Sequence, residues 1–441
     1  MVSWSTTKFC QGVGGCFLSM DEPSDSASSA RAGGVTLGRD GKAGPAEVFE
    51  RLIVSSTELA GLAESLAETP SFGRNLLGVA ARLRLISEDL RTCREPAPYA
   101  RALNDLVRNH PAIPSSLLRR SESSYRYVSI LLLTDLVRAW MTPEEKEAAW
   151  AAKLVHFGLA QLLDDLVDDG RVPADAVERS FAAVFAGLFV EDSQTAANAS
   201  LVRRQFGEFA PPSGELALEM VAVLRGLLRG AAHFKRVTPA LREDVNLFAR
   251  GQALSALLRG PRPPIPEIRS RAALLPAPYP DIVWQDRLAK SLTFATSLTL
   301  IDLAFAHGLP SGFDLERHLR AWYLVDVIMG ESDHLATLRA DRARELTNSA
   351  ALLLYPGSTD LVGEGVATLE VATAGKYEVL LTHWASLARR ALDLRPPTAP
   401  GSGDVYGDIA LGPALTLLPT QLPFSAEHLF TSYLSALADR R

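Results

Sequence analysis

The sequence predicts an all-α protein, a single large helical bundle that follows a disordered N-terminal arm. Two observations predict this class. Apolar residues recur at spacings of three and four from residue 46 onward, which is the period of an amphipathic helix. Convincing runs of alternating apolar and polar residues bounded by turns do not occur, so a sheet is not predicted.

Composition and patterning divide the chain into four parts. Residues 1–45 include a stretch rich in Ser, Gly and Ala with few large apolar groups, which predicts a disordered arm. Residues 46–130 are predicted to form helices that flank the core, and residues 131–394 the main helical domain. Residues 395–441 are predicted to be a loop and a C-terminal helix.

The clearest predicted helix is "MTPEEKEAAWAAKLVHFGLAQLLDDLVDDG". Thr142 can cap it, Pro143 suits the first helical position, and Glu145 completes a Thr-x-x-Glu capping box. Gly170 supplies a stop at the C-terminal end. These signals predict a helix of about 26 residues, close to 40 Å long.

Four further regions have helical period: residues 175–258, 281–307, 312–347 and 362–393. Between the first two, the segment 259–280 carries seven prolines. Because proline fixes φ and lacks a backbone N–H, we expect a long connection without regular structure there.

Charge and cysteine content exclude several classes of function. The formal net charge is −6, with 45 basic and 51 acidic residues, and no dense Lys/Arg run, so nucleic acid is not expected as a partner. The three cysteines give neither a disulfide framework nor a Cys-x-x-Cys metal site. The sequence has no run of eighteen apolar residues of the kind that predicts a membrane span, and its start lacks a signal-peptide pattern. A cytoplasmic protein is therefore expected.

An unusual acidic cluster, "QLLDDLVDDG", ends the clearest helix. At 100° per residue Asp164 and Asp168 lie within about 40° of each other, with Asp165 at the edge of the same face. Acidic groups at a helix C-terminus oppose the helix dipole, and neighbouring carboxylates repel one another. A hard divalent cation such as Mg²⁺ would relieve both effects. The alternative is a solvated helix end.

A second acidic segment lies far along the chain. Asp333, Thr337 and Asp341 follow one another at four-residue steps, which places them within about 80° on a helix. Two carboxylates with a hydroxyl between them are suitable ligands for another Mg²⁺ ion. The alternative is exposed acids paired with Arg339 or Arg344.

These two segments resemble the two metal motifs of class I terpene synthases. "LLDDLVDD" is similar to their aspartate-rich motif, and Asp333-x-x-x-Thr337-x-x-x-Asp341 is similar to their second metal motif. Arg287 precedes Asp333 by 46 residues, the spacing of the family's diphosphate-sensing arginine, and "WASLARR" resembles the segment that normally ends in Arg-Tyr. The resemblance covers residues 130–392 and implies a helical bundle of the class I isoprenoid synthase type.

The resemblance implies a Mg²⁺-dependent terpene synthase, which ionises a linear prenyl diphosphate and cyclises the carbocation with release of diphosphate. It implies Mg²⁺ as the cofactor, three ions together with the diphosphate. The implied metal ligands are Asp164, Asp165, Asp168, Asp333, Thr337 and Asp341. The implied catalytic residues are Asp164, Asp165, Asp168 and Arg287, and the implied diphosphate ligands are Arg287, Arg339 and Arg389. The expected pocket aromatics are Trp150, Phe157, Phe294, Trp322 and Tyr323.

The sequence also departs from the family pattern. Asp341 replaces the usual Glu, Asp333 replaces the commoner Asn, and Arg390 stands where Tyr is usual. Three alternatives therefore stay open: a trans-prenyl diphosphate synthase, a squalene or large-terpene type of synthase, and a catalytically inactive helical binding protein. Assembly as a homodimer is also left open.

Overall fold

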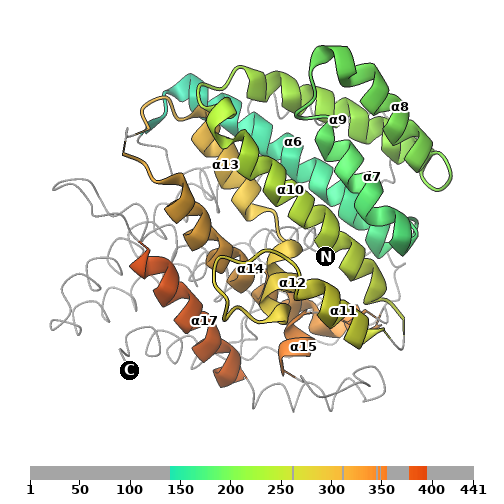
Figure 1. Ribbon diagram of the computed structural model, residues 1–441, viewed down its shortest axis with the longest axis vertical. Coiled ribbons are helices and arrows are strands. Elements are labelled where there is room, and N and C mark those ends of the chain that lie inside the picture. Colours follow the sequence, from blue (N-terminus) through green and yellow to red (C-terminus); the bar gives the residue numbers. More distant parts are fainter. Residues whose placement is uncertain are drawn as a thin grey trace, which may run out of the picture.

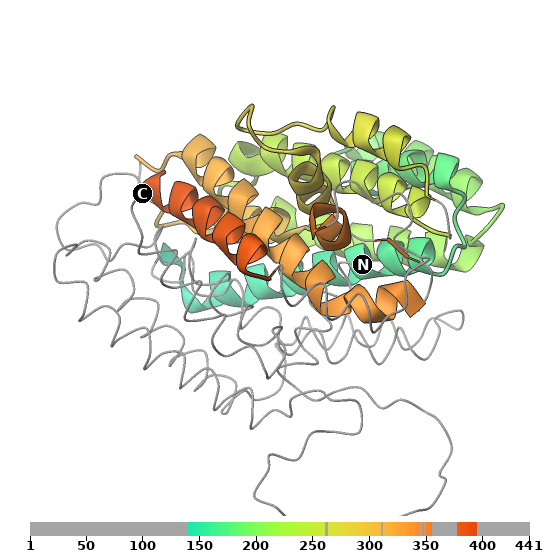
Figure 2. The ribbon, with the colours of Figure 1, turned by 90° about the horizontal axis from the view of Figure 1, so that it is seen from below.

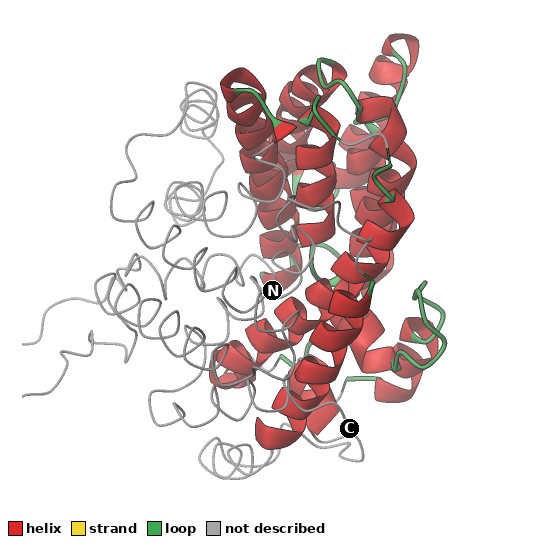
Figure 3. Cartoon of the chain, turned by 90° about the vertical axis from the view of Figure 1, so that its left-hand side faces the viewer, coloured by secondary structure: helices red, strands yellow, loops and turns green. Residues whose placement is uncertain are grey.

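The computed structural model describes residues 140–260, 263–309, 312–343, 346–347, 349–354 and 377–394. Figure 3 shows that this part of the chain consists of helices and loops. Within it, β-pairing occurs as an isolated antiparallel bridge between Arg259 and Leu346. The all-α prediction is confirmed for these residues. The predicted N-terminal arm, the flanking helices at 46–130 and the final helix lie outside them.

Helix α6 (Pro143–Asp168) has the boundaries that its sequence predicts. The backbone N–H of Glu145 donates to the Thr142 hydroxyl at 3.2 Å, and the N–H of Thr142 donates to the Glu145 carboxylate at 2.9 Å. This reciprocal pair is a capping box. At the other end Gly170 has a φ of 67°, in the left-handed region that glycine adopts without strain.

Eleven further elements follow α6 in the described residues. They are α7 (Ala174–Ala186), the 3₁₀ turn η3 (Asp192–Gln194), α8 (Thr195–Phe206), α9 (Pro211–Arg229), α10 (Phe234–Leu257), α11 (Ile265–Ala272), α12 (Trp284–Ser291), α13 (Ala295–Phe305), α14 (Leu315–Ala343), α15 (Ser349–Leu354) and α17 (Tyr377–Asp393).

The helices pack in two groups joined by a central set. Helices α6 to α9 pack against one another, and α14 packs against α15 and α17. Between the two groups lie α10, α12 and α13, as Figure 1 shows. Figure 2 shows α17 running alongside α14. Buried apolar side chains from all these helices form one continuous core.

The prediction of no regular structure at 259–280 was wrong. The segment 259–280 contains α11, because the prolines of the segment lie near its two ends and leave 267–275 free of proline. Pro266 lies in the first turn of the helix, which tolerates proline. The region 281–307, for which helical period was predicted, contains the two helices α12 and α13. The hydroxyls of Ser291 and Thr293 donate to the carbonyls of Leu288 and Lys290, which satisfies carbonyls at the end of α12.

No single helix of the described residues has the length and apolar character to cross a membrane. Helices α12 and α13, bent by 54° at their junction, meet the length and composition test only as a pair.

Candidate functional site

The acidic end of α6 is partly sunk into the protein. Asp164 is fully buried, and its Oδ1 accepts a hydrogen bond of 2.9 Å from the side-chain amide of Gln252 on α10. Asp165 and Asp168 are half-buried, whereas Asp169 is exposed and forms an ion pair with Arg171. The last turn of α6 contains no basic residue that would offset this charge.

The second predicted metal segment lies in the C-terminal half of α14. Asp341 is buried, with 3% of its surface exposed. Asp333, Thr337 and Arg339 belong to the same helix, but their side chains, like that of Trp150 on α6, lie outside what the structure describes. The predicted four-residue spacing therefore falls on a continuous helix.

The ends of α6 and α14 are linked through the segment that follows α10. The guanidinium of Arg259 donates to the carbonyl of Val167 in the last turn of α6. Arg259 also pairs with Leu346, whose N–H donates to the Asp341 carbonyl at 2.8 Å. On the same segment, the carbonyl of Leu258 accepts from the N–H of Thr347 at 3.1 Å. The two acidic segments therefore end in the same region of the molecule.

Arg287, the predicted diphosphate-sensing arginine, binds backbone carbonyls. Its Nη1 donates to the carbonyls of Ala273 and Leu275, each at 2.8 Å, and its Nε donates to that of Ile282 at 3.1 Å. These bonds fix the loop between α11 and α12. Arg389, on α17, is half-buried.

Two of the predicted pocket aromatics contact each other in the core. The rings of Phe157 and Phe294 lie 5.4 Å apart, and Phe248 meets Phe294 edge-on at 6.0 Å. All three are buried. Phe157 lies about two turns before Asp164 on α6, so this aromatic cluster is within the core beside the acidic end.

The other two predicted aromatics lie on α14. Trp322 is fully buried against the ring of His318. Tyr323 lines a cavity of about 250 Å³ together with residues of α10, the 276–278 loop and α12. Its buried hydroxyl has no hydrogen-bond partner. Burial raises the pKa of Tyr323, although the charges of Lys290 and Arg287 oppose the rise.

The base of this cavity carries a buried ionic network that the sequence analysis missed. Nζ of Lys290 lies 2.7 Å from Asp244 and 2.9 Å from Asp326. Burial alone would lower the pKa of Lys290, but the two carboxylates outweigh it and hold the pKa above its ordinary value. Because Lys290 already faces two acids, its ammonium group does not offer an uncompensated positive charge to a diphosphate.

For another buried acid the sequence does carry a signal. Asp302 interrupts a largely apolar stretch, "LTLIDLAF". A charged residue at a core position of a helix is rarely buried without a partner. Lys153 of α6, 2.8 Å from Asp302, is such a partner.

Comparison with known proteins adds no relative. The chain matches no protein-family model, no curated protein and no solved structure. The function has to be argued from its own residues.

Proposed function

We propose that this protein is a Mg²⁺-dependent enzyme of the class I terpene synthase type, which ionises a linear prenyl diphosphate and cyclises the carbocation with release of diphosphate. One observation supports this function above the others. The aspartate-rich end of α6 and the acidic second half of α14, far apart in the chain, are linked through Arg259 and Leu346.

The donor groups suit the proposed cofactor. The two segments offer carboxylates, with Thr337 as a hydroxyl, and hard oxygen ligands of this kind are those that Mg²⁺ prefers. Bound Mg²⁺ would supply Lewis-acid stabilisation of the charge that develops on the diphosphate. In this assignment Asp164, Asp165 and Asp168 hold one side of the cluster, and Asp333, Thr337 and Asp341 hold the other.

The reaction breaks the bond between the allylic carbon and the diphosphate oxygen, and the electron pair leaves with the diphosphate. The carbocation then cyclises and either loses a proton, which gives a hydrocarbon, or adds water and then loses a proton, which gives an alcohol. Arg339 and Arg389 would hold the leaving diphosphate by charge-assisted hydrogen bonds. Nε and Nη1 of Arg287 bind three backbone carbonyls and fix the loop before α12, so Nη2 is the group that would donate to the diphosphate.

A second candidate function, binding without turnover, is favoured by the contacts of two of these residues. Asp164 is fully buried and already accepts a hydrogen bond from Gln252. Arg287 is engaged by backbone carbonyls. Both sets of contacts are compatible with a protein that binds a prenyl diphosphate without ionising it.

Incubation of the full chain with Mg²⁺ and geranyl, farnesyl or geranylgeranyl diphosphate separates these functions, with products measured by gas chromatography and mass spectrometry. A cyclised hydrocarbon or alcohol, with matching pyrophosphate release, is the expected result. A longer diphosphate formed only with added isopentenyl diphosphate would identify an elongating enzyme instead. Absence of product and of pyrophosphate release would overturn the proposed turnover.

Asp168→Asn is expected to abolish this turnover, because it removes a metal-binding carboxylate and leaves the side-chain shape. Asp169→Asn is the matched control: it removes the same charge one residue further on, where the side chain is exposed and paired with Arg171. Equal activity of both variants and the wild type would remove the metal assignment.

A further inference from the structure

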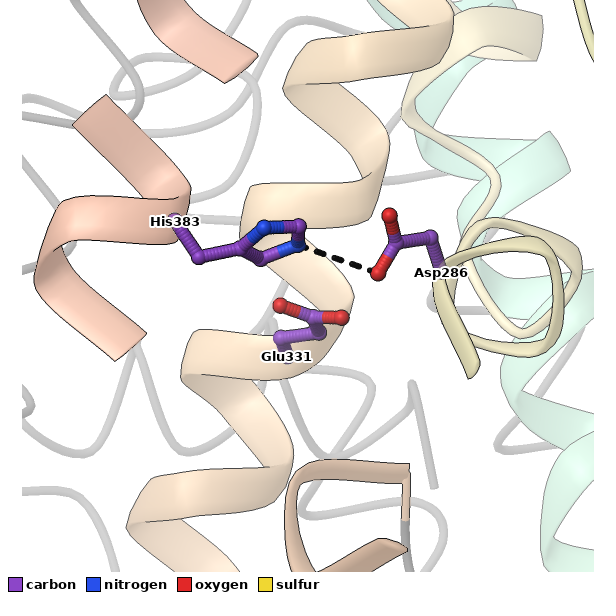
Figure 4. A group of neighbouring side chains, drawn as sticks. All are labelled: Asp286, Glu331 and His383. Carbon is purple, nitrogen blue, oxygen red and sulfur yellow. Dashed lines mark hydrogen bonds and ion pairs between the residues drawn. The ribbon is translucent and has the colours of Figure 1, made fainter. Parts of the chain in front are cut away.

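Three ionisable side chains from separate helices converge within the second half of the bundle. Asp286 comes from α12, Glu331 from α14 and His383 from α17, as Figure 4 shows. One potential ligand atom from each lies within 4.8 Å of the others. On α14, Glu331 lies ten residues before Asp341, about 15 Å along the axis, and two residues before Asp333, about 200° around it. Helix geometry therefore directs Glu331 away from the face of the acidic segment.

The two carboxylates of this group are buried together. Asp286 and Glu331 are 1% and 0% exposed. Nε2 of His383 lies 3.1 Å from Oδ1 of Asp286. Two acids and a single imidazole therefore share a region where unbalanced charge is costly.

The carboxylate of Glu331 is only partly satisfied. Nε1 of Trp384 donates to its Oε2 at 2.6 Å, which fixes the orientation of the side chain. Its Oε1 is buried and has no hydrogen-bond partner. In Figure 4 the Glu331 carboxylate lies beside both the His383 ring and the Asp286 carboxylate. A cation between the three groups would satisfy this oxygen and balance the charge.

We infer that Asp286, Glu331 and His383 bind a divalent first-row transition-metal ion. One imidazole and two carboxylates are ligands typical of Zn²⁺, Mn²⁺, Fe²⁺ or Co²⁺, whereas Mg²⁺ favours oxygen ligands alone. The indole of Trp384 acts as an outer partner that orients a metal ligand. The His383 side chain is 29% exposed, which leaves an approach for the ion from solvent.

Titration of the metal-free full chain with Co²⁺ tests this site. The expected result is a saturable visible spectrum at one ion per chain, displaced by Zn²⁺. Glu331→Gln keeps the shape and an acceptor for Trp384 but removes the charge, and His383→Gln removes the imidazole. Each is expected to weaken Co²⁺ binding at least about 10-fold.

Asp281→Asn is the matched control. Asp281 is an exposed carboxylate bound by Arg390 of α17, 2.8 Å away, so the variant loses one negative charge near the same helix. Its Co²⁺ affinity should equal that of the wild type. Circular dichroism checks the fold of each variant, and should Glu331→Gln fail to fold, the half-buried His383 carries the test.

Two results would overturn the inferred site. One is an absence of saturable Co²⁺ binding by the wild type, which would leave the three side chains as a proton-sharing network. The other is wild-type affinity in the Glu331 and His383 variants. This inference does not depend on the proposed turnover, because Asp168→Asn should abolish the latter and leave Co²⁺ binding intact.

Discussion

Buried ionisable residues in this protein are mostly paired across helices. Lys153 of α6 meets Asp302 of α13, and Lys290 of α12 meets Asp244 of α10 and Asp326 of α14. Removing one partner of such a pair leaves an unbalanced buried charge, which typically costs about 3–5 kcal/mol. These pairs therefore fix which helices lie next to one another.

Burial governs the titration of two fully buried histidines, His156 and His318. Burial lowers the pKa of His156 to about 4, with the charge of Asp244 opposing, and lowers that of His318 to about 3. Both nitrogens of His156 are buried without hydrogen bonds. The unfolded chain therefore binds protons that the folded one does not, and stability present above pH 6.5 is lost as the pH falls toward these values.

His156→Leu should reduce this pH dependence. For His156 the free energy of unfolding falls by up to about 1.4 kcal/mol per pH unit below 6.5, and leucine removes that contribution. The measurement is urea denaturation at pH 7.5 and pH 5.5. His307→Leu is the control, because His307 is exposed. The difference in its unfolding free energy between the two pH values should equal that of the wild type. An unchanged difference in His156→Leu would show that burial does not govern this imidazole.

At the scale of elements, α12 is positioned by close backbone contacts. A Cβ added at Gly251 of α10 would lie 2.1 Å from the Ser291 carbonyl oxygen, and one at Gly330 of α14 would lie 2.6 Å from that of Ala289. Both neighbouring helices thus approach the backbone of α12 more closely than any side chain allows. This packing places Asp286 and Lys290 against residues of α10 and α14.

Gly251→Ala should therefore destabilise the protein by at least about 1–3 kcal/mol, because the α12 backbone would have to move. Gly226 in α9 is the matched control, since nothing lies within 4 Å of an added Cβ there. Gly226→Ala should stabilise by up to about 1 kcal/mol through helix propensity. Thermal and urea denaturation measure both, and a stable Gly251→Ala variant would contradict the close packing of α10 on α12.

How far the sequence predicts each element depends on whether its signals are local. Helix α6 was predicted in full because its capping box, Pro143 and Gly170 all act within a few residues. Helix α11 is masked by the proline content of its segment as a whole, whereas the positions of those prolines, near the two ends, allow it. The break between α12 and α13 follows hydroxyl bonds of Ser291 and Thr293 that periodicity does not reveal.

The same distinction applies to the candidate site. The acidic cluster at the end of α6 is visible in the sequence because four aspartates, the last of them just beyond the helix, interrupt one short apolar run. The group of Asp286, Glu331 and His383 was missed, because each residue is single in its own helix and the three meet only through the packing of α12 and α17 on α14. No sequence spacing encodes such a meeting.

At the scale of the whole molecule, the segment 258–260 joins two distant parts of the chain. It follows α10, contacts the last turn of α6 through Arg259, and pairs with residues 346–347 beyond α14. Under the proposed function, a ligand bound between these ends would be held by both acidic segments. Its binding free energy would then depend on each segment separately.

Mg²⁺ and inorganic pyrophosphate together should therefore stabilise the full chain, whereas either alone should have little effect. A ligand at about 100 times its Kd adds about 2.7 kcal/mol to the free energy of unfolding, which a thermal denaturation series detects. Asp168→Asn and Asp333→Asn should each abolish the effect, since each removes a metal ligand from one side, while Asp169→Asn should retain it. Stabilisation of the Asp333 variant equal to that of the wild type would mean that α14 does not share the ligand. Stabilisation by a transition-metal ion without pyrophosphate would instead indicate binding at the separate group of Asp286, Glu331 and His383. That group supplies its own ligands and charge balance, so it needs no phosphate oxygens.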